Sequence, residues 1–149
     1  MRLAQRNGSA PMTQLTSLSA LQMAEMIRRK EISPVKLVEA HLHRIVALQP
    51  KLNAFVHLNA DGARARARAA KAPVMRGEAF VPLHGVPLTV KSCIDVAGWK
   101  CEAGSALRKG YVPAQDAVLV ARFKVAGPIL IGNTNVPEFL MAYEPEFPF

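Results

Sequence analysis

The sequence of 149 residues is half hydrophobic and one fifth charged, which is the composition of one ordinary globular domain. This composition excludes an intrinsically disordered chain, and no apolar run is long enough for a membrane-spanning helix. The formal net charge of +8 could favour an anionic partner.

Much of the excess positive charge lies in one alanine-rich run that contains Arg64, Arg66, Arg68 and Lys71. The run has no aromatic residue on which a nucleic-acid base could stack, and no nucleic-acid-binding motif occurs elsewhere in the chain. We interpret the run as a solvated helix face and do not expect nucleic acid as a partner.

Residues 1–14 are expected to form a flexible tail before a domain at residues 15–149, because MRLAQRNGSAPM lacks the apolar centre of a signal peptide. Cys93 and Cys101 have seven residues between them, a spacing that fits no metal or redox motif. We therefore expect two free cysteines in a cytoplasmic protein, with no metal and no cofactor.

Two helices are predicted near the N-terminus. Ser19 and Gln22 have the spacing of a capping box, which starts the first helix. Ser33 and Pro34 start the second, because serine caps a helix and proline in the first turn costs no hydrogen bond. Its amphipathic stripe consists of Val35, Val38, Leu42 and Ile45. We expect this helix to end before Pro50.

A strand and a helix are predicted next. The strand lies within residues 53–58 (NAFVHL). Asn59 or Asp61 is expected to cap the arginine- and alanine-rich helix that follows, which runs to about Lys71. Residues 72–80 contain Pro73 and Gly77 and predict a surface loop.

The segment LHGVPLTVKSCID, residues 83–95, contains a strand that ends at Lys91. Apolar residues alternate with other residues from Val86 onward, a period of two that places Lys91 on the same face as Thr89. Spacing alone leaves two interpretations open for this lysine. It either extends its ammonium group into solvent from the strand end, or it loses hydration and becomes a neutral base.

The last third of the sequence predicts a loop, a helix and a buried strand. Glycines at residues 98, 104 and 110 mark the loop, in which backbone can approach a ligand closely. Asp116 is expected to cap a helix that ends at Gly127. The predicted buried face of this helix consists of Leu119, Phe123 and Ala126.

The apolar run Pro128–Ile131 predicts a strand that is buried on both faces of a sheet. Residues 132–135 (GNTN) predict a sharp turn, and Asn135 with Glu138 has the spacing of a helix start near Pro137. Helices that alternate with buried strands indicate a layered α/β architecture.

Five blocks, in this order, resemble the amidase signature family, whose members hydrolyse amides with a Ser-cisSer-Lys triad. The blocks are SALQMAEMIRRKEISPVKLVEAHLHRI, PKLNAF, LHGVPLTVKSCIDVAG, AGSALRKGYVPAQDAVLVARFKVAG and ILIGNTNVPEF, and the match runs from about residue 15 to residue 144. The family includes amidases and the glutamine-hydrolysing A subunit of the tRNA-dependent amidotransferase. The resemblance implies the N-terminal part of an α/β/α sandwich with a mixed central sheet, incomplete in this chain.

The resemblance also implies that Lys91 is the catalytic lysine, which takes a proton through the cis serine from the nucleophilic serine. It makes Gly104, Ser105, Thr134 and Asn135 candidates for the substrate pocket or its loops. The family's Gly-Gly-Ser-Ser-Gly-Gly stretch, beyond which the nucleophile lies, does not occur in these 149 residues. We therefore expect an amidase-family fragment, truncated before the catalytic loop, that is inactive alone and acts on a small amide only in the complete enzyme.

Two positions depart from the common family pattern. Ser92 stands where an acidic residue usually follows the lysine, and Asn133 stands where lysine is common. Two alternative functions stay open. One is a new catalytic pair of Lys91 with Ser105, or Cys93 as the nucleophile. The other is a non-catalytic fragment that binds a second chain through an open sheet edge such as residues 128–131.

Overall fold

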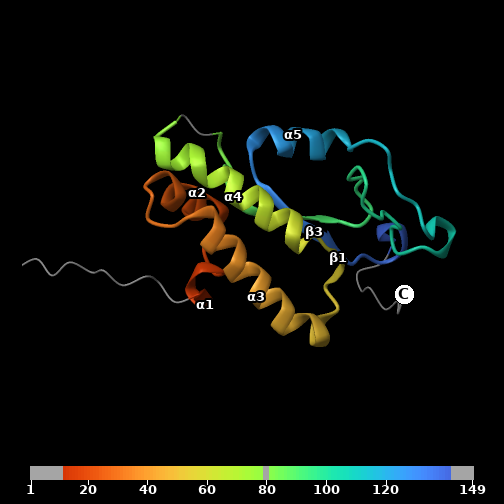
Figure 1. Cartoon of the computed structure of the whole chain (residues 1–149). Coiled ribbons are helices and arrows are strands. Elements are labelled where there is room, and N and C mark those ends of the chain that lie inside the picture. The colour runs from red at the N-terminus through yellow and green to blue at the C-terminus, as the bar shows by residue number, and fades with distance from the viewer. Residues whose placement is uncertain (1–11, 79–80, 142–149) are drawn as a thin grey trace, which may run out of the picture.

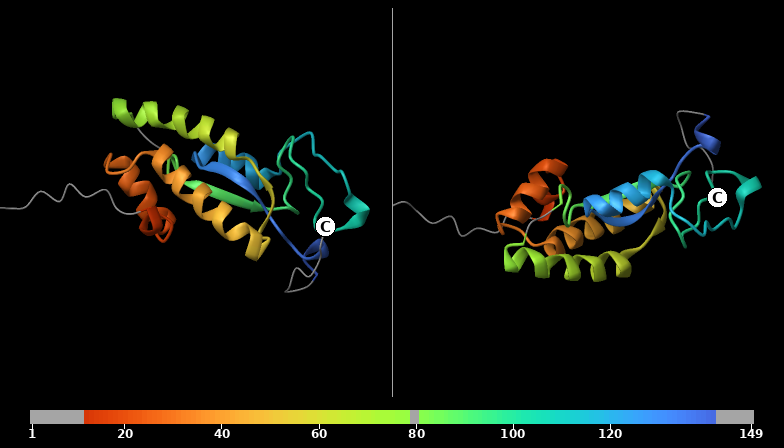
Figure 2. Two further views of the ribbon diagram at one scale, coloured as in Figure 1. Left: turned by 60° about the horizontal axis from the view of Figure 1, so that its bottom comes forward. Right: turned by 90° about the horizontal axis from the view of Figure 1, so that it is seen from above.

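The computed structural model describes residues 12–78 and 81–141. Its centre is a sheet with the strand order β1-β3-β2. The central strand β3 (Ile129–Thr134) pairs antiparallel with β1 (Phe55–Leu58) and parallel with β2 (Pro87–Lys91). Helices α3 (Pro34–Leu52) and α4 (Ala60–Arg76) cover one face, and α5 (Val118–Ala126) covers the other (Figures 1 and 2). This mixed, three-layered α/β arrangement is the predicted one.

The N-terminal helices form as the sequence predicts. Met12–Leu15 is a single helical turn, α1, and residues 1–11 of the predicted tail lie outside the described part. In α2 (Ala20–Arg28), the Ser19 hydroxyl accepts from the Gln22 amide while the Gln22 side chain accepts from the Ser19 amide, a complete capping box. In α3, the Ser33 hydroxyl accepts from the Lys36 amide. These helices contribute most of one buried cluster, which contains Ile27, Leu37 and Val86.

Two predicted helix ends were wrong, because both helices continue past a proline. Helix α3 contains Pro50 in its last turn and ends where Asn53 takes a left-handed conformation, φ 44°. Helix α4 contains Pro73 and ends at Gly77, φ 72°, so most of the predicted 72–80 loop is helical. A proline near a helix end interrupts few backbone hydrogen bonds. Asn59 precedes α4 without a capping side-chain hydrogen bond.

The predicted turn at residues 132–135 is also wrong, since Gly132, Asn133 and Thr134 complete strand β3. The register between β2 and β3 shifts after Leu88, which leaves Ile131 as an extra residue on β3. Ile129 and Ile131 pack against α3 and α4. Strand β3 lies between β1 and β2, the outer strands of the described sheet, but β1 pairs only with residues 132–134. Within the predicted edge, Ile129 and Leu130 pair with β2 alone, and the Ile131 carbonyl accepts from the Asn59 amide.

Helix α5 differs from its prediction at both its start and its buried face. Ala117 precedes the helix, and Asp116 instead accepts from the Ala97 amide and from Lys124. The fully buried residue is Val120, whereas Leu119 is 46% exposed. Val120 packs with Val90 and Val96, on the face of the sheet opposite α3 and α4. Gly127 ends the helix, as predicted.

The predicted helix start at Asn135 and Glu138 is a short 3-10 turn, Glu138–Leu140. The Asn135 side chain accepts from the adjacent Val136 amide, and the Glu138 carboxylate bonds to Ser105. Neither side chain is therefore used as a helix cap. The turn contains left-handed residues at Phe139, φ 46°, and Leu140, φ 62°.

Candidate functional site

Lys91 ends β2 at the carboxyl edge of the parallel pair β2 and β3. It is in register with Thr134, and the amide of Ser92 donates to the Thr134 carbonyl at 3.0 Å. Val90 is buried in the cluster with Val120, so the alternation along the strand places Lys91 on the other face of the sheet. Lys91 is exposed to solvent, as the first of the two interpretations for a lysine at a strand end predicts.

A cavity of about 520 Å³ lies beside this carboxyl edge. The cavity is lined by Asn53, Phe55, Val56, Ser92, Lys100, Glu102, Gly104, Ser105, Ala106, Lys109 and Asn135. Three of the predicted pocket residues, Gly104, Ser105 and Asn135, are thus brought together. Lys91 and Thr134 lie at the ends of the adjacent strands but do not line the cavity. Ligands bind at the carboxyl ends of strands in many α/β sheets.

One wall of the cavity is a loop held against the turn that follows β3. Gly104 has φ 64°, and a Cβ atom there would lie 2.5 Å from the Val136 carbonyl oxygen. The Phe139 amide donates to the Ala103 carbonyl at 2.9 Å. Ala103 itself has φ 52°, a left-handed conformation that an alanine adopts only under constraint. Such constrained backbone often accompanies a functional site.

The Ser105 hydroxyl is occupied. It donates to Glu138 Oε1 at 2.6 Å and accepts from the Leu107 amide at 3.2 Å. Its hydrogen-bond partner is thus a carboxylate, and Lys91 is not its partner among the described residues. Ser105 serves as a loop-forming residue here, which weakens the alternative of a catalytic pair with Lys91.

The two positions that depart from the family pattern are both buried. Ser92 is 2% exposed and lines the cavity. Asn133 is fully buried; its Nδ2 donates to the Lys100 carbonyl at 3.0 Å, and its Oδ1 has no partner among the described residues. Asn133 therefore anchors the loop that carries Lys100.

That loop and the neighbouring strand β1 contain groups that the sequence did not single out. The His57 ring lies 4.9 Å from the Trp99 ring, and burial together with the nearby Lys100 charge lowers the pKa of His57. The Arg108 guanidinium lies over the Tyr111 ring at 4.2 Å. The only sequence signal for this region was its glycine-rich, charged composition.

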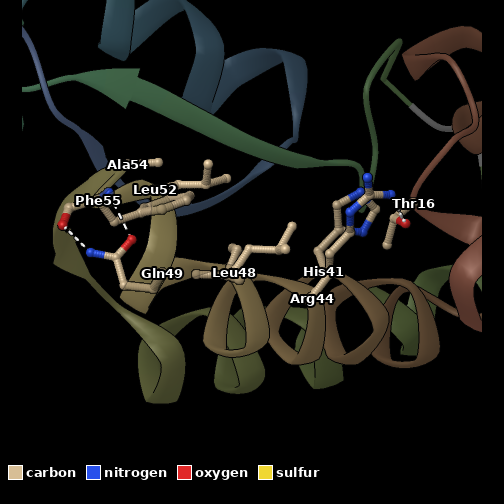
Figure 3. Close-up of a pocket in the computed structure, with 9 residues that line it drawn as sticks. Thr16, His41, Arg44, Leu48, Gln49, Leu52, Ala54 and Phe55 are labelled. Atoms are coloured by element: carbon tan, nitrogen blue, oxygen red, sulfur yellow. Dashed lines mark hydrogen bonds between the residues drawn. The ribbon is translucent and has the colours of Figure 1, made fainter.

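A second, more apolar groove of about 220 Å³ runs along α3 (Figure 3). Its lining includes Leu48, Leu52 and Phe55, with Arg44 at one end. Arg44 donates to the Thr16 hydroxyl at 2.6 Å, and the Gln49 amide group bonds both the carbonyl and the amide of Phe55, at 2.8 and 3.0 Å. No pattern in the sequence indicated this groove.

A metal site needs at least three His, Cys, Asp or Glu side chains close together, and the described ranges contain no such group. In the same residues, no helix combines the length and apolar character needed to cross a membrane.

The sequence is similar to proteins of known family. The amidase family model matches residues 36–149. The A subunit of the glutamyl-tRNA(Gln) amidotransferase from Salinispora arenicola is 40% identical over 136 residues, and its counterpart from Roseiflexus castenholzii is 42% identical over 135 residues. Each alignment covers 91% of this chain. The chain spans 28% and 27% of the length of these two relatives.

Solved structures agree with the sequence matches. The peptide amidase of Stenotrophomonas maltophilia aligns with a TM-score of 0.76 and 32% identity, covering 87% of this chain and 26% of its own. A bacterial aryl acylamidase of the amidase signature family aligns with a TM-score of 0.73 and 30% identity, covering 82% of this chain and 26% of its own. The described fold is therefore part of a larger one, and the chain belongs to the amidase family.

Proposed function

We propose that this chain supplies the lysine base of an amidase-family hydrolase that cleaves the C–N bond of a small carboxylic amide. The observation that carries the proposal is the place of Lys91, at the carboxyl end of β2 and in register with Thr134 of the parallel strand β3. This edge lies inside the segment that matches the amidase family. The solvent-exposed ammonium group is free to meet groups that are not among these residues.

In this proposal, the chain alone does not hydrolyse amides. A serine hydroxyl attacks a carbonyl only when a base removes its proton, and both groups must lie within hydrogen-bond reach. Among the described residues, Ser92 and Ser105 are the serines near the carboxyl edge, and both are buried. Ser105 is engaged by Glu138. The nucleophile and the cis serine must therefore come from another segment, and the amide substrate is bound only when that segment is present.

A chimaera tests the role of Lys91. Residues 12–141 replace the matching segment of the Stenotrophomonas maltophilia peptide amidase, and ammonia release from an amide is measured. We expect an active chimaera in which Lys91→Met lowers the rate about 1,000-fold, because general-base catalysis is lost. Lys71→Met removes an exposed lysine from α4 and is the matched control, with an unchanged rate. A Lys91→Met chimaera of full activity would refute the role of Lys91, and amide hydrolysis by the 149-residue chain alone would refute the need for another segment.

A second candidate function is a non-catalytic chain that binds a partner by strand addition. The observation that favours it is the outer position of β2, where Pro87 sits at the strand start, as is typical of an edge. Sedimentation of the purified chain tests this candidate: a discrete dimer or complex that Thr89→Pro abolishes would support it. A monomer would exclude self-association through this edge.

Free thiols at Cys93 and Cys101 fit a reducing compartment such as the cytoplasm.

A further inference from the structure

We propose that the 520 Å³ cavity beside the carboxyl ends of β2 and β3 binds a small organic carboxylate. The proposal goes beyond amide hydrolysis, because it concerns the polar groups of the cavity and does not require Lys91 or any serine nucleophile. It rests on three features: a buried serine in the cavity wall, two ammonium groups without an ion pair among the described residues, and an asparagine amide that keeps a free N–H.

The first feature is the hydroxyl of Ser92. Ser92 is 2% exposed, and it lines the cavity. Both backbone polar groups of Ser92 are hydrogen-bonded: the amide donates to the Thr134 carbonyl, and the carbonyl accepts from the Ala103 amide and the Cys101 thiol. A serine hydroxyl in the cavity wall can donate to a ligand acceptor.

The second feature is the charge on the cavity wall. The side chains of Lys100 and Lys109 line the cavity and form no ion pair within residues 12–78 and 81–141. They carry two positive charges that a carboxylate can neutralise. Glu102 is the one acidic side chain in the described lining, and its Oε1 accepts from the Gly110 amide at 2.7 Å.

The third feature is the balance of donors and acceptors. Ser105 donates to Glu138, so its proton is not available to a ligand. Asn135 Oδ1 accepts from the Val136 amide, while Nδ2 makes only a long contact of 3.5 Å with the Asn53 carbonyl and keeps a second N–H. The lining therefore carries two ammonium groups and a free amide N–H beside one carboxylate, and its net charge is positive. This chemistry selects an anionic acceptor over a neutral or cationic ligand, and the volume fits a ligand of several carbon atoms.

Titration of the ¹⁵N-labelled chain with glutarate tests the proposal, with chloride used to match the ionic strength. We expect saturable shifts of the amide resonances of Gly104, Ala106 and Asn135. Glutaramide has the same carbon chain but no charge, and it should bind at least tenfold more weakly. Glutarate shifts that are absent, that do not include the cavity residues, or that glutaramide reproduces at the same concentration would overturn the proposal.

Variants identify the groups responsible. Replacing both exposed lysines, Lys100→Gln with Lys109→Gln, should weaken glutarate binding at least tenfold. The control Arg68→Gln with Lys71→Gln removes two exposed positive charges from α4 and should change binding less than twofold. An equal loss in the control would show non-specific attraction to a basic chain and would overturn the site. Ser92→Asp places a carboxylate in the wall and should also abolish binding; because Ser92 is buried, the lysine variants decide the outcome if that variant does not fold.

Discussion

Ser105 donates its hydroxyl hydrogen to the carboxylate of Glu138 at 2.6 Å, across 33 residues of sequence. The bond joins the loop after β2 to the turn after β3. A backbone hydrogen bond from Phe139 to Ala103, at 2.9 Å, lies next to it. The exits of two neighbouring parallel strands are thus tied together, and they form one wall of the cavity.

The first prediction concerns this bond. Glu138→Ala should lower the free energy of unfolding by about 1–2 kcal/mol, because a buried serine hydroxyl loses a charged acceptor. Glu138→Gln keeps an acceptor oxygen and should recover about half of the loss. Urea denaturation measures both variants. An alanine variant as stable as the parent chain would mean that the hydrogen bond contributes nothing to the fold.

The second prediction separates two costs at Gly104. Gly104→Ala places a side chain at φ 64° and brings its Cβ within 2.5 Å of the Val136 carbonyl oxygen. Gly110→Ala has the same kind of backbone, φ 79°, but no atom of the described residues lies within 4 Å of its Cβ. We expect Gly110→Ala to cost about 1 kcal/mol and Gly104→Ala at least about 2 kcal/mol more. Thermal or urea unfolding measures the difference, and equal costs would show that the close contact is relaxed in solution.

Local signals in the sequence were sufficient for the elements that depend on local chemistry. The capping box at Ser19 and the Ser33-Pro34 start use bonds between neighbouring residues, so both helices begin where the sequence places them. The period of two up to Lys91 likewise predicted the strand β2. The parallel pairing, in contrast, brings residues about 40 positions apart together, and no local pattern encodes it.

The wrong predictions at residues 132–135 and at Asp116 have a common physical cause. In both places, tertiary contacts override the conformation that the local sequence prefers. GNTN has the composition of a turn, but Asn133 is held in β3 by its bond to the Lys100 carbonyl and by pairing on both sides. Asp116 has the composition of a cap, but Lys124 and the Ala97 amide compete for it. The cavity-lining lysines were missed because only the folded loop brings Lys100 and Lys109 to the strand ends.

The third prediction follows from the misassigned face of α5. Val120→Ala removes two methyl groups from a fully buried site and should cost about 2 kcal/mol. Leu119→Ala removes a larger group from a site that is 46% exposed and should cost less than about 1 kcal/mol. Chemical denaturation of the two variants checks the order. The reverse order would favour the buried face that the sequence alone predicted.

The fourth prediction is a pH dependence at Asp116. The hydrogen bond from Lys124, and then that from the Ala97 amide, hold the pKa of the Asp116 carboxyl below its ordinary value. A lowered pKa in the folded state stabilises the fold above the unfolded pKa of about 3.9, and the contribution disappears as the pH falls through the folded pKa. Asp116→Asn should therefore be less stable than the parent by a constant amount above about pH 5, and the gap should close below about pH 4.

The control for this experiment is Asp61→Asn, which removes a fully exposed carboxylate whose ion-pair partner among the described residues is Arg64. Exposed pairs of this kind contribute about 0–1 kcal/mol. Unfolding followed by circular dichroism at several pH values gives both curves. A gap between Asp116→Asn and the parent that stays constant down to about pH 2 would contradict the assignment to this carboxyl.

The fifth prediction distinguishes the two thiols. Cys101 is fully buried, its thiol donates to the Ser92 carbonyl at 3.1 Å, and burial raises its pKa to about 12. Alkylation requires the thiolate, which at pH 8 is about one part in 10,000 for such a group. Cys93 is only partly buried. Iodoacetamide should therefore modify one cysteine of the native chain and both after denaturation, as counted by mass spectrometry. Cys93→Ser should abolish native modification and Cys101→Ser should not; the opposite result would mean that the loop beside Ser92 opens faster than the reagent reacts.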